Sequence, residues 1–577
     1  MKRYGKYIRP YWYAFILGPL LMLTEVAGEV LLPSFMADII NIGAANHDVG
    51  YIVQKGIIMI LTALIMMAGG VGGAWFASVA AINFGAGLRK DAFKKIQTFS
   101  FSEIDRFSTG SLVTRLTNDI TQVQNLIMMA LRMMLRAPGM LIGAIIMAFL
   151  MNRELAAVFL VILPVMTAAI ILLLRIAYPR FEFMQKKLDA LNSNIQEVLT
   201  NVRVIKSFVR EDYESARFEK SNAELKESSL NAFKIAIAQM PLMMLFMNLT
   251  TLVVVWLGGN QILDGKMQVG DLTAFTTYIV QVLMSLMMLA MVFLQSSRAF
   301  ASGRRINEVM DTQVSLTDDH AAYPEAVVKS GKIEFQNVSF RYYKDSAEKV
   351  LDQINLTIEP GQMIGIIGST GCGKTTLVSM IPRLYDVDEG KVLVDGIDVR
   401  DYSLNHLREG VGMVLQKNVL FSGTIEENLQ WGDENAGKDQ IRKAAESAQA
   451  EGFIQKLADG YDTELGQGGV NVSGGQKQRL CIARALLKRP KILILDDSTS
   501  AVDTATEAKI REAFSTTLKE TTKLIIAQRI GSVMEADQIV VMDEGKIVGL
   551  GKHEDLLETC KAYQEIYDSQ MKKEVIA

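Results

Sequence analysis

The sequence predicts two parts of different fold class, a membrane all-α domain with six long transmembrane helices followed by an α/β domain. Half of the 577 residues are hydrophobic and the mean hydropathy is +0.20, which is more apolar surface than a soluble protein of this length could easily bury. This excess lies before about residue 300, whereas the later residues show a strand, a glycine-rich loop and a helix in succession. We expect residues 1–310 in the membrane domain, 311–331 as a linker and 332–577 in the α/β domain.

The membrane part contains six apolar segments, each long enough to cross a bilayer as a helix. They cover about residues 12–41, 52–86, 124–150, 154–178, 235–262 and 271–300. Two of the connections, 87–123 and 179–234, are long and rich in Lys and Arg, and the other three are short and nearly neutral. Basic loops stay in the cytoplasm, so the pattern predicts three brief outer loops and two long helical inner loops.

The location of the chain follows from the same pattern. The basic N-terminus, with Lys2, Arg3, Lys6 and Arg9, is expected in the cytoplasm together with the α/β domain. The three cysteines are all in the later half and have no pairing or metal-ligand spacing, which fits a reducing compartment. A net charge of −3 gives no argument for a nucleic acid partner. We therefore expect a multi-pass protein of a cell membrane.

A phosphate-binding loop follows the apolar strand pattern of residues 363–367. The glycines would let backbone N–H groups converge on phosphate oxygens, Lys374 would reach the β- and γ-phosphates, and the Thr375 hydroxyl would ligate Mg²⁺. ATP and Mg²⁺ are thus the expected cofactors. The predicted cofactor-binding residues of this loop are Gly368, Ser369, Thr370, Gly371, Cys372, Gly373, Lys374, Thr375 and Thr376.

Three further positions bear on hydrolysis of the nucleotide. Asp496 ends the apolar strand pattern of residues 492–495, a place suited to holding Mg²⁺ through water. Asp497 stands where a carboxylate would polarise the attacking water, and an aspartate there is one methylene too short. Gln528 offers a neutral amide where a histidine could carry positive charge toward the γ-phosphate. These residues predict a site that holds ATP and splits it poorly.

The segment Val472–Arg479, followed by a helix pattern rich in alanine and leucine, resembles the signature segment of ATP-binding cassette (ABC) transporters. The resemblance implies that this segment caps a nucleotide held by an opposite subunit. It further implies Tyr342 as the aromatic that stacks on adenine, Gln416 as a catalytic-loop residue near Mg²⁺, and Asp503 as a contact to the opposite site. The signature residues predicted to bind the cofactor are Ser473, Gly474, Gly475 and Gln476.

The inner loops carry a second resemblance, to the coupling segments of six-span ABC exporters. Residues 107–112, followed by Arg115, Asn118 and Asp119, are similar to the first coupling segment, and residues 202–208 resemble the stretch that enters the second. Such segments would lie on the nucleotide domain near Gln416 and convert its closure into rotation of the membrane helices. Solvated loops are the alternative.

Ionisable residues and methionines inside the apolar segments leave two interpretations open. Glu25 and Glu29 are four residues apart, as are Arg132 and Arg136, so each pair should share a helix face. They either line a polar translocation pathway or fix helix register as structural pairs. Packing is the favoured interpretation of the methionines, with a pocket for varied apolar ligands as the alternative; they include Met128, Met129, Met133, Met134, Met243, Met244, Met287, Met288 and Met291.

The sequence as a whole resembles the degenerate-site subunit of a heterodimeric bacterial exporter of the multidrug or lipid type. It would pair with a competent second half and move hydrophobic or amphipathic compounds out of the cell. Gln467, just before the signature, stands where the family usually has a glutamate, which fits an asymmetric pair or tolerated drift. An ATP-gated regulatory subunit that does not hydrolyse ATP, and a slow homodimeric exporter, are the alternatives.

Overall fold

The computed structural model describes residues 2–344, 346–498 and 502–574, and the chain divides into two compact units. The first unit comprises Met1–Ile96 and Gly110–Thr312, and the second comprises Gln97–Thr109 and Gln313–Ala577. A short stretch that precedes the third apolar segment therefore belongs to the same unit as the α/β domain.

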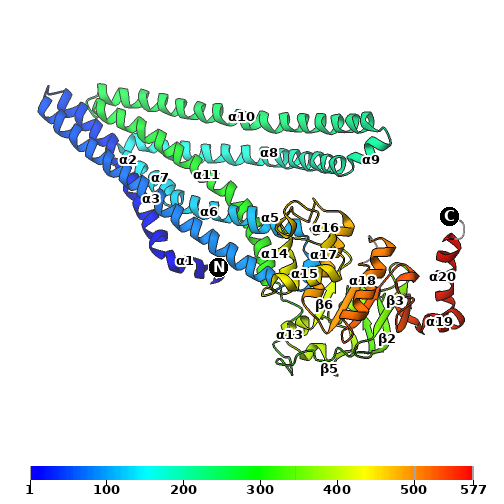
Figure 1. The fold of residues 1–577 in the computed structure, drawn as a ribbon. Coiled ribbons are helices and arrows are strands. Elements are labelled where there is room, and N and C mark those ends of the chain that lie inside the picture. Colours follow the sequence, from blue (N-terminus) through cyan, green and yellow to red (C-terminus); the bar gives the residue numbers. More distant parts are fainter. Residues whose placement is uncertain (1, 345, 499–501, 575–577) are drawn as a thin grey trace. The chain divides into compact units, whose positions relative to one another are not determined.

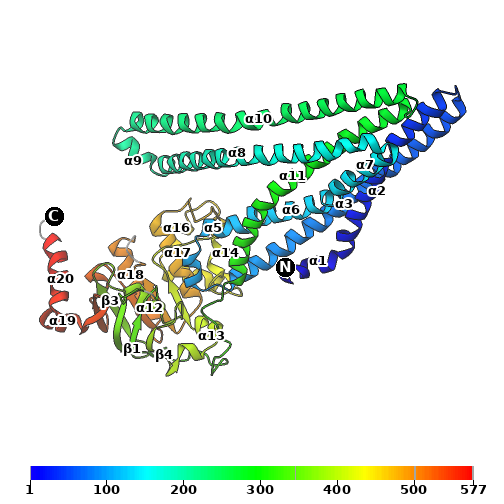
Figure 2. The ribbon, with the colours of Figure 1, turned by 180° about the vertical axis from the view of Figure 1, so that it is seen from behind.

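Within its described residues, the first unit is helical. Six helical runs are long and apolar enough to cross a membrane, which confirms the predicted six-helix membrane domain. Helix α11 packs against α2 and α7, and Figure 2 shows these helices together. The helices are α1 (Gly5–Ile8), α2 (Trp12–Asp38), α3 (Val49–Gln97), α5 (Thr109–Thr114), α6 (Ile120–Met133), α7 (Arg136–Met151), α8 (Arg153–Thr200), α9 (Val202–Ser207), α10 (Glu211–Leu263) and α11 (Val269–Asp311).

Helices α3, α8 and α10 continue well beyond their apolar segments, as the charged inner loops predict. Helices α8 and α10 lie side by side, with α9 at their turn (Figure 1). Ion pairs join their polar ends, with 2.7 Å between Lys187 Nζ and Glu224 Oε2 and 3.0 Å between Arg217 Nη2 and Glu197 Oε2.

The third span is interrupted between α6 and α7, at Met134 and Leu135. Pro138 explains the break, because its ring nitrogen has no hydrogen to donate to the carbonyl of Met134 and its ring crowds that carbonyl. The break separates Arg132, in the last turn of α6, from Arg136, the first residue of α7. Both arginines nevertheless line one cavity, as expected of residues that share a face of the span, although the helix between them is interrupted.

The second unit contains a four-stranded antiparallel sheet and a six-stranded sheet. The four-stranded sheet has the order β2 (Leu351–Ile358), β1 (Ile333–Phe340), β4 (Glu389–Val394) and β5 (Ile397–Asp398). In the six-stranded sheet all strands are parallel except β12, and its order is β12 (Lys546–Gly551), β11 (Gln538–Asp543), β3 (Met363–Gly368), β10 (Thr522–Ile526), β9 (Ile492–Asp496) and β6 (Val411–Val414). A further pair consists of β7 (Gly423–Thr424) and β8 (Glu464–Leu465).

Helices of this unit alternate with the strands, as in an α/β fold, which confirms the predicted fold class. They are α4 (Phe101–Arg106), α12 (Lys374–Ser379), α13 (Leu404–Glu409), α14 (Ile425–Gln430), α15 (Lys438–Ser447), α16 (Glu451–Ile454), α17 (Gly474–Leu487), α18 (Thr504–Thr517), α19 (His553–Thr559) and α20 (Lys561–Glu574).

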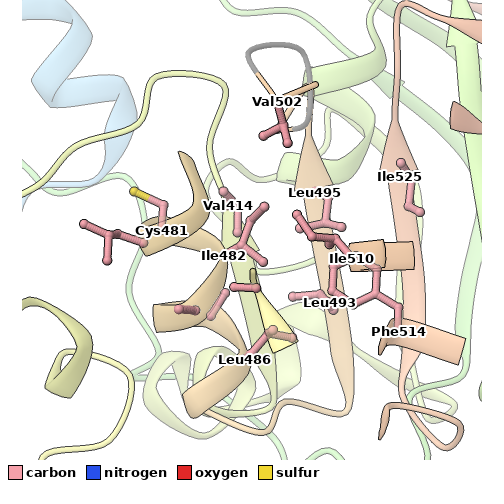
Figure 3. Packing of buried hydrophobic residues seen from close by; sticks show 14 of the residues in the cluster. Val414, Cys481, Ile482, Leu486, Leu493, Leu495, Val502, Ile510, Phe514 and Ile525 are labelled. Atoms are coloured by element: carbon pink, nitrogen blue, oxygen red, sulfur yellow. The ribbon is translucent and has the colours of Figure 1, made fainter. Parts of the chain in front are cut away.

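The central strands are buried on both faces because their side chains alternate between two cores. In β9, Leu493 and Leu495 pack with Ile482 of α17 and Phe514 of α18, as Figure 3 shows. The neighbouring residues of the same strand, Ile492 and Ile494, enter the core on the other face. The unbroken apolar run of β9 thus fixes the position of Asp496 at its carboxyl end.

Candidate nucleotide site

A cavity of about 830 Å³ opens at the carboxyl ends of β3 and β9, the edge at which parallel sheets bind ligands. It collects most of the predicted site residues. Cys372 is absent from the lining, because its side chain is buried in the core beneath the loop. The predicted residues that line the cavity are Tyr342, Gly368, Ser369, Thr370, Gly371, Gly373, Lys374, Thr375, Thr376, Gln416, Asp496, Asp497 and Gln528.

The loop between β3 and α12 has the backbone geometry of a phosphate cradle. Gly373 has a φ of +98°, and a Cβ there would lie 2.8 Å from the carbonyl oxygen of Val350, so the position requires glycine. The Lys374 ammonium donates to the carbonyl oxygens of Gly368 and Ser369, at 2.8 and 2.7 Å. The lysine is therefore held over the loop at the start of α12, where backbone N–H groups face an anion.

Asp496 is almost fully buried, at 1 % exposure, at the end of β9. The Thr375 hydroxyl donates to its Oδ1 at 3.1 Å, and its Oδ2 is buried with no hydrogen-bond partner among the described residues. Burial raises the pKa of Asp496, and the neighbouring carboxyl of Asp497 raises it further. A hydroxyl oxygen beside an unsatisfied carboxylate oxygen fits Mg²⁺, which prefers oxygen ligands and retains water.

Asp497 is held by an amide from the neighbouring strand. Gln528 follows β10, and its Nε2 donates to Asp497 Oδ2 at 2.7 Å. Burial raises the pKa of Asp497, and hydrogen bonds from Gln528 and Gln416 oppose that rise. Asp497 also has a φ of +50°, a left-handed conformation that aspartate adopts more readily than most residues.

Tyr342 lies at the other side of the same cavity, with 43 % of its surface exposed. Its hydroxyl is 2.9 Å from the Thr376 hydroxyl. Its ring meets the rings of Phe340 and Tyr385 edge to face, with centroids 5.0 and 5.3 Å apart. These contacts fix the ring at the cavity, and a fixed, half-exposed aromatic ring is suited to stacking on a base.

The signature residues lie outside this cavity. Ser473 is the N-cap of α17, where its hydroxyl accepts from the Gln476 N–H and its own N–H donates to Gln476 Oε1 at 2.8 Å. Asp503 caps α18 by accepting from the Thr506 N–H at 2.9 Å, and this hydrogen bond lowers its pKa. The predicted site residues therefore fall into two separate groups, one around the phosphate-binding loop and one at the starts of α17 and α18.

Four polar residues of the cavity lining are not among the predicted site residues, namely Asp543, Glu565, Ser569 and Gln570. Asp543, at the end of β11, accepts from the Ser369 hydroxyl at 3.2 Å. Its place at a parallel strand's carboxyl end was a usable signal. Gln570, on α20, donates to the carbonyl oxygen of Gln528 at 2.8 Å and accepts from the Ile530 N–H at 2.9 Å. No local pattern marks Gln570, because it acts through a contact with a distant loop.

Helix α4 belongs to the same unit and contacts Tyr385. The Tyr385 hydroxyl donates to Asp105 Oδ2 at 2.7 Å, and the Phe101 ring lies 6.0 Å from the Tyr385 ring. Burial and the Asp105 carboxylate raise the pKa of Tyr385, so the phenol remains a donor at neutral pH. Because Tyr385 also touches Tyr342, this helix is joined to the cavity through one aromatic residue.

Comparisons with known proteins agree with this geometry. Residues 15–286 match the family described as "ABC transporter transmembrane region", and residues 351–500 match "ABC transporter". An uncharacterized ABC transporter ATP-binding protein, YfiB of Bacillus subtilis (strain 168), is 42% identical over 574 residues, which cover 100% of this chain and 99% of the relative. An ATP-dependent lipid A-core flippase of Desulfotalea psychrophila (strain LSv54 / DSM 12343) is 34% identical over 483 residues, covering 84% of this chain and 84% of the relative.

A solved structure covers the whole fold. A bacterial Atm1-family ABC exporter with ATP bound superposes with a TM-score of 0.79 at 25% identity, over 98% of each chain. The resemblance drawn from the signature segment is thereby confirmed, as is the location predicted from the loops. This chain belongs to the ABC transporters, as an exporter-type half-transporter with a multi-pass membrane domain and a cytoplasmic ATPase domain that binds ATP.

Proposed function

We propose that this chain is one half of a heterodimeric ATP-driven exporter and that its own nucleotide site turns over slowly. The observation that carries the proposal is the 2.7 Å hydrogen bond from Gln528 to Asp497. A carboxylate at this position must accept a hydrogen bond from the attacking water. Asp497 has about 1.5 Å less reach than a glutamate would have, and one of its oxygens already accepts from Gln528.

Gln528 contributes a second deficit. Its amide donor is directed to Asp497, and it cannot become positively charged as an imidazole can. Charge that develops on the γ-phosphate in the transition state would therefore lack one stabilising cation. ATP would still be held by the Lys374 ammonium and the loop N–H groups, with Thr375 and Asp496 placed for Mg²⁺, which would neutralise phosphate charge when bound.

The signature residues support a partner subunit. ABC exporters work as dimers, and Ser473 and its neighbours cap α17 outside this chain's own cavity. A helix N-terminus with a serine hydroxyl is suited to facing the γ-phosphate of a nucleotide held by another chain. We infer that this intact segment completes the partner's site, where most hydrolysis would occur. Gln467, which replaces a usual glutamate, fits such an asymmetric pair.

The membrane domain would move hydrophobic or amphipathic compounds outward by alternating access. Residues 1–310 would form this domain, 311–331 the linker and 332–577 the ATPase domain. Helix α4 supports coupling, because Tyr385 joins it to Tyr342 at the nucleotide cavity. Closure of the cavity around ATP would thus displace α4 and, through it, the helices that follow.

Two alternative functions for this chain predict different features. An ATP-gated regulatory subunit would not need the Ser473 cap, which serves another chain's chemistry. A slow homodimeric exporter would carry Asp497 and Gln528 at both of its sites.

The test is to purify the complex through a tag on this chain from the cells that make it naturally. The complex is incubated with ATP and Mg²⁺, freed of unbound nucleotide and quenched, and the retained nucleotides are counted by chromatography. We expect two different halves and one unhydrolysed ATP per dimer. A complex of identical chains, or recovery of ADP alone, would contradict the proposal.

A further inference from the structure

A second cavity, of about 520 Å³, lies in the first unit between α2, α3 and the third span. Its apolar wall includes four methionines, Met22, Met66, Met67 and Met133. The side chains differ in freedom, since Met22 is buried at 3 % exposure and Met67 is 62 % exposed. Unbranched thioethers adapt to ligands of different shape. Met243, by contrast, is buried in the helix core, as the packing interpretation predicts.

Three charged residues line this cavity, Glu25, Arg132 and Arg136, and two of them form an ion pair with each other. Arg136 Nη2 lies 2.8 Å from Glu29 Oε1 and 3.1 Å from Glu25 Oε1. The three side chains are 24, 22 and 19 % exposed, respectively. One guanidinium thus pairs with two partly buried carboxylates on successive turns of α2. This is the structural pairing that would fix the positions of the helices.

Arg132 is the third charged residue of the cavity lining. Its side chain is exposed on the cavity, and across the described residues it forms no ion pair or hydrogen bond. It lies eight residues inside the third apolar segment, so its Cα is about 12 Å along the helix from the nearer end of that segment. An arginine at such depth is costly unless it meets water or an anion.

We propose that this cavity binds the anionic headgroup of an amphipathic compound on Arg132, with the apolar chain against the methionines. A guanidinium matches a sulfonate, phosphate or carboxylate with two parallel hydrogen bonds. With Arg136 engaged by Glu25 and Glu29, Arg132 is the cation left to set the preference for charge. The inference rests on the proposed function as an exporter of amphipathic compounds, and it names their charge.

The test uses the full-length complex in nanodiscs of zwitterionic phosphatidylcholine. The probes are three fluorescent dodecyl compounds that differ in headgroup alone: a sulfonate, an ammonium and an uncharged alcohol. Binding isotherms are measured for wild type, Arg132→Gln, Arg132→Lys and Arg175→Gln. Arg175 is the matched control, because it is an exposed arginine of α8 that does not line this cavity.

We expect Arg132→Gln to weaken sulfonate binding about tenfold or more, since a charge-assisted hydrogen bond is lost. Arg132→Lys should retain part of the affinity, because it keeps the charge and loses the two parallel hydrogen bonds, and Arg175→Gln should leave the affinity unchanged. Binding of the ammonium and the alcohol should not fall in any variant. Unchanged sulfonate binding in Arg132→Gln, or an equal loss in Arg175→Gln, would overturn the proposal.

Two further measurements complete the design. Adding anionic phosphatidylglycerol to the discs separates the sources of the anion: competition with the sulfonate identifies a membrane lipid as occupant, and its absence identifies an added amphiphile. Retained nucleotide in each variant, measured as above, tests the proposed function separately. Normal ATP retention with unchanged sulfonate binding would reject the Arg132 site and leave the exporter proposal standing.

Discussion

The Nε2 of Gln528 donates a 2.7 Å hydrogen bond to Oδ2 of Asp497, joining the ends of two neighbouring parallel strands. Strand pairing brings the two residues together, since Ile526 of β10 lies opposite Asp496 of β9. The contact joins Asp497, at the position expected of the general base, to Gln528, at the position expected to face the γ-phosphate. Substitution at either residue therefore changes the hydrogen bonding of the other.

Asp497→Ala should leave most of the ATPase activity of the complex intact. The reason is that the proposed competent site lies on the partner, whose corresponding acid is a general base worth about a hundredfold or more. Steady-state ATPase rates of the two mutant complexes make the comparison. Equal losses would show that the sites are equivalent.

Changes in the signature segment should have the opposite pattern. Ser473→Ala, or Gly475→Asp, should lower turnover of the complex more than the same changes in the partner's segment. Alanine removes a hydroxyl donor and aspartate adds negative charge beside the γ-phosphate, each costing about tenfold to a thousandfold. Full activity in Gly475→Asp would show that this segment does not face the competent site.

Asp497→Glu together with Gln528→His should raise hydrolysis at this chain's own site by about a hundredfold or more, the scale of an added general base. Either change alone should do little, because both residues act on one transition state. Glutamate must also adopt the left-handed backbone of position 497, where φ is +50°. Single-turnover phosphate release is measured with the partner's acid disabled, and a double mutant as slow as wild type would assign the silence to another feature.

Tyr342→Ala should weaken ATP binding about tenfold, within the range of base–aromatic stacking. Tyr342→Phe is the matched control, because it keeps the ring and loses only the 2.9 Å contact with Thr376. Equilibrium binding of a fluorescent ATP analogue to the complex distinguishes them. If both variants weaken binding equally, the hydroxyl rather than the ring is the important group.

Tyr385→Phe should weaken the coupling between the nucleotide site and the membrane domain without changing the affinity for ATP. It removes the hydrogen bond to Asp105, while the ring contacts with Phe101 and Tyr342 remain. We expect stimulation of the ATPase by transported compounds to fall at least about twofold, the effect of losing one hydrogen bond. Tyr343→Phe, at a site 78 % exposed, is the control. An equal change in that control would show that the Asp105 contact has no part in coupling.

The sequence predicts features that depend on local pattern. Six apolar segments are enough to give six spans, because a bilayer demands helices of a minimum length. Strand, glycine loop and helix bring Lys374 and Thr375 to one cavity, since neighbours in this motif are also neighbours in space. The alternation of buried residues in β9 likewise follows from its unbroken apolar run.

Features that depend on distant contacts escape such reasoning. Asp105 and Tyr385 are 280 positions apart, and nothing in either neighbourhood indicates the other. Gln570 lies on a polar terminal helix whose packing determines its role. The break in the third span is different, because a residue of the local sequence, Pro138, explains it.

The cap at Ser473 has a stereochemical consequence. A hydroxyl has two lone pairs and a single hydrogen, and the Gln476 N–H already occupies one lone pair. The hydrogen is left able to donate to a group outside the helix, because the backbone N–H groups of the first turn of α17 are themselves donors. The same hydroxyl can therefore start the helix and donate a hydrogen bond to a group outside it. Threonine could reproduce both roles, whereas asparagine could start the helix yet would present an amide of different reach.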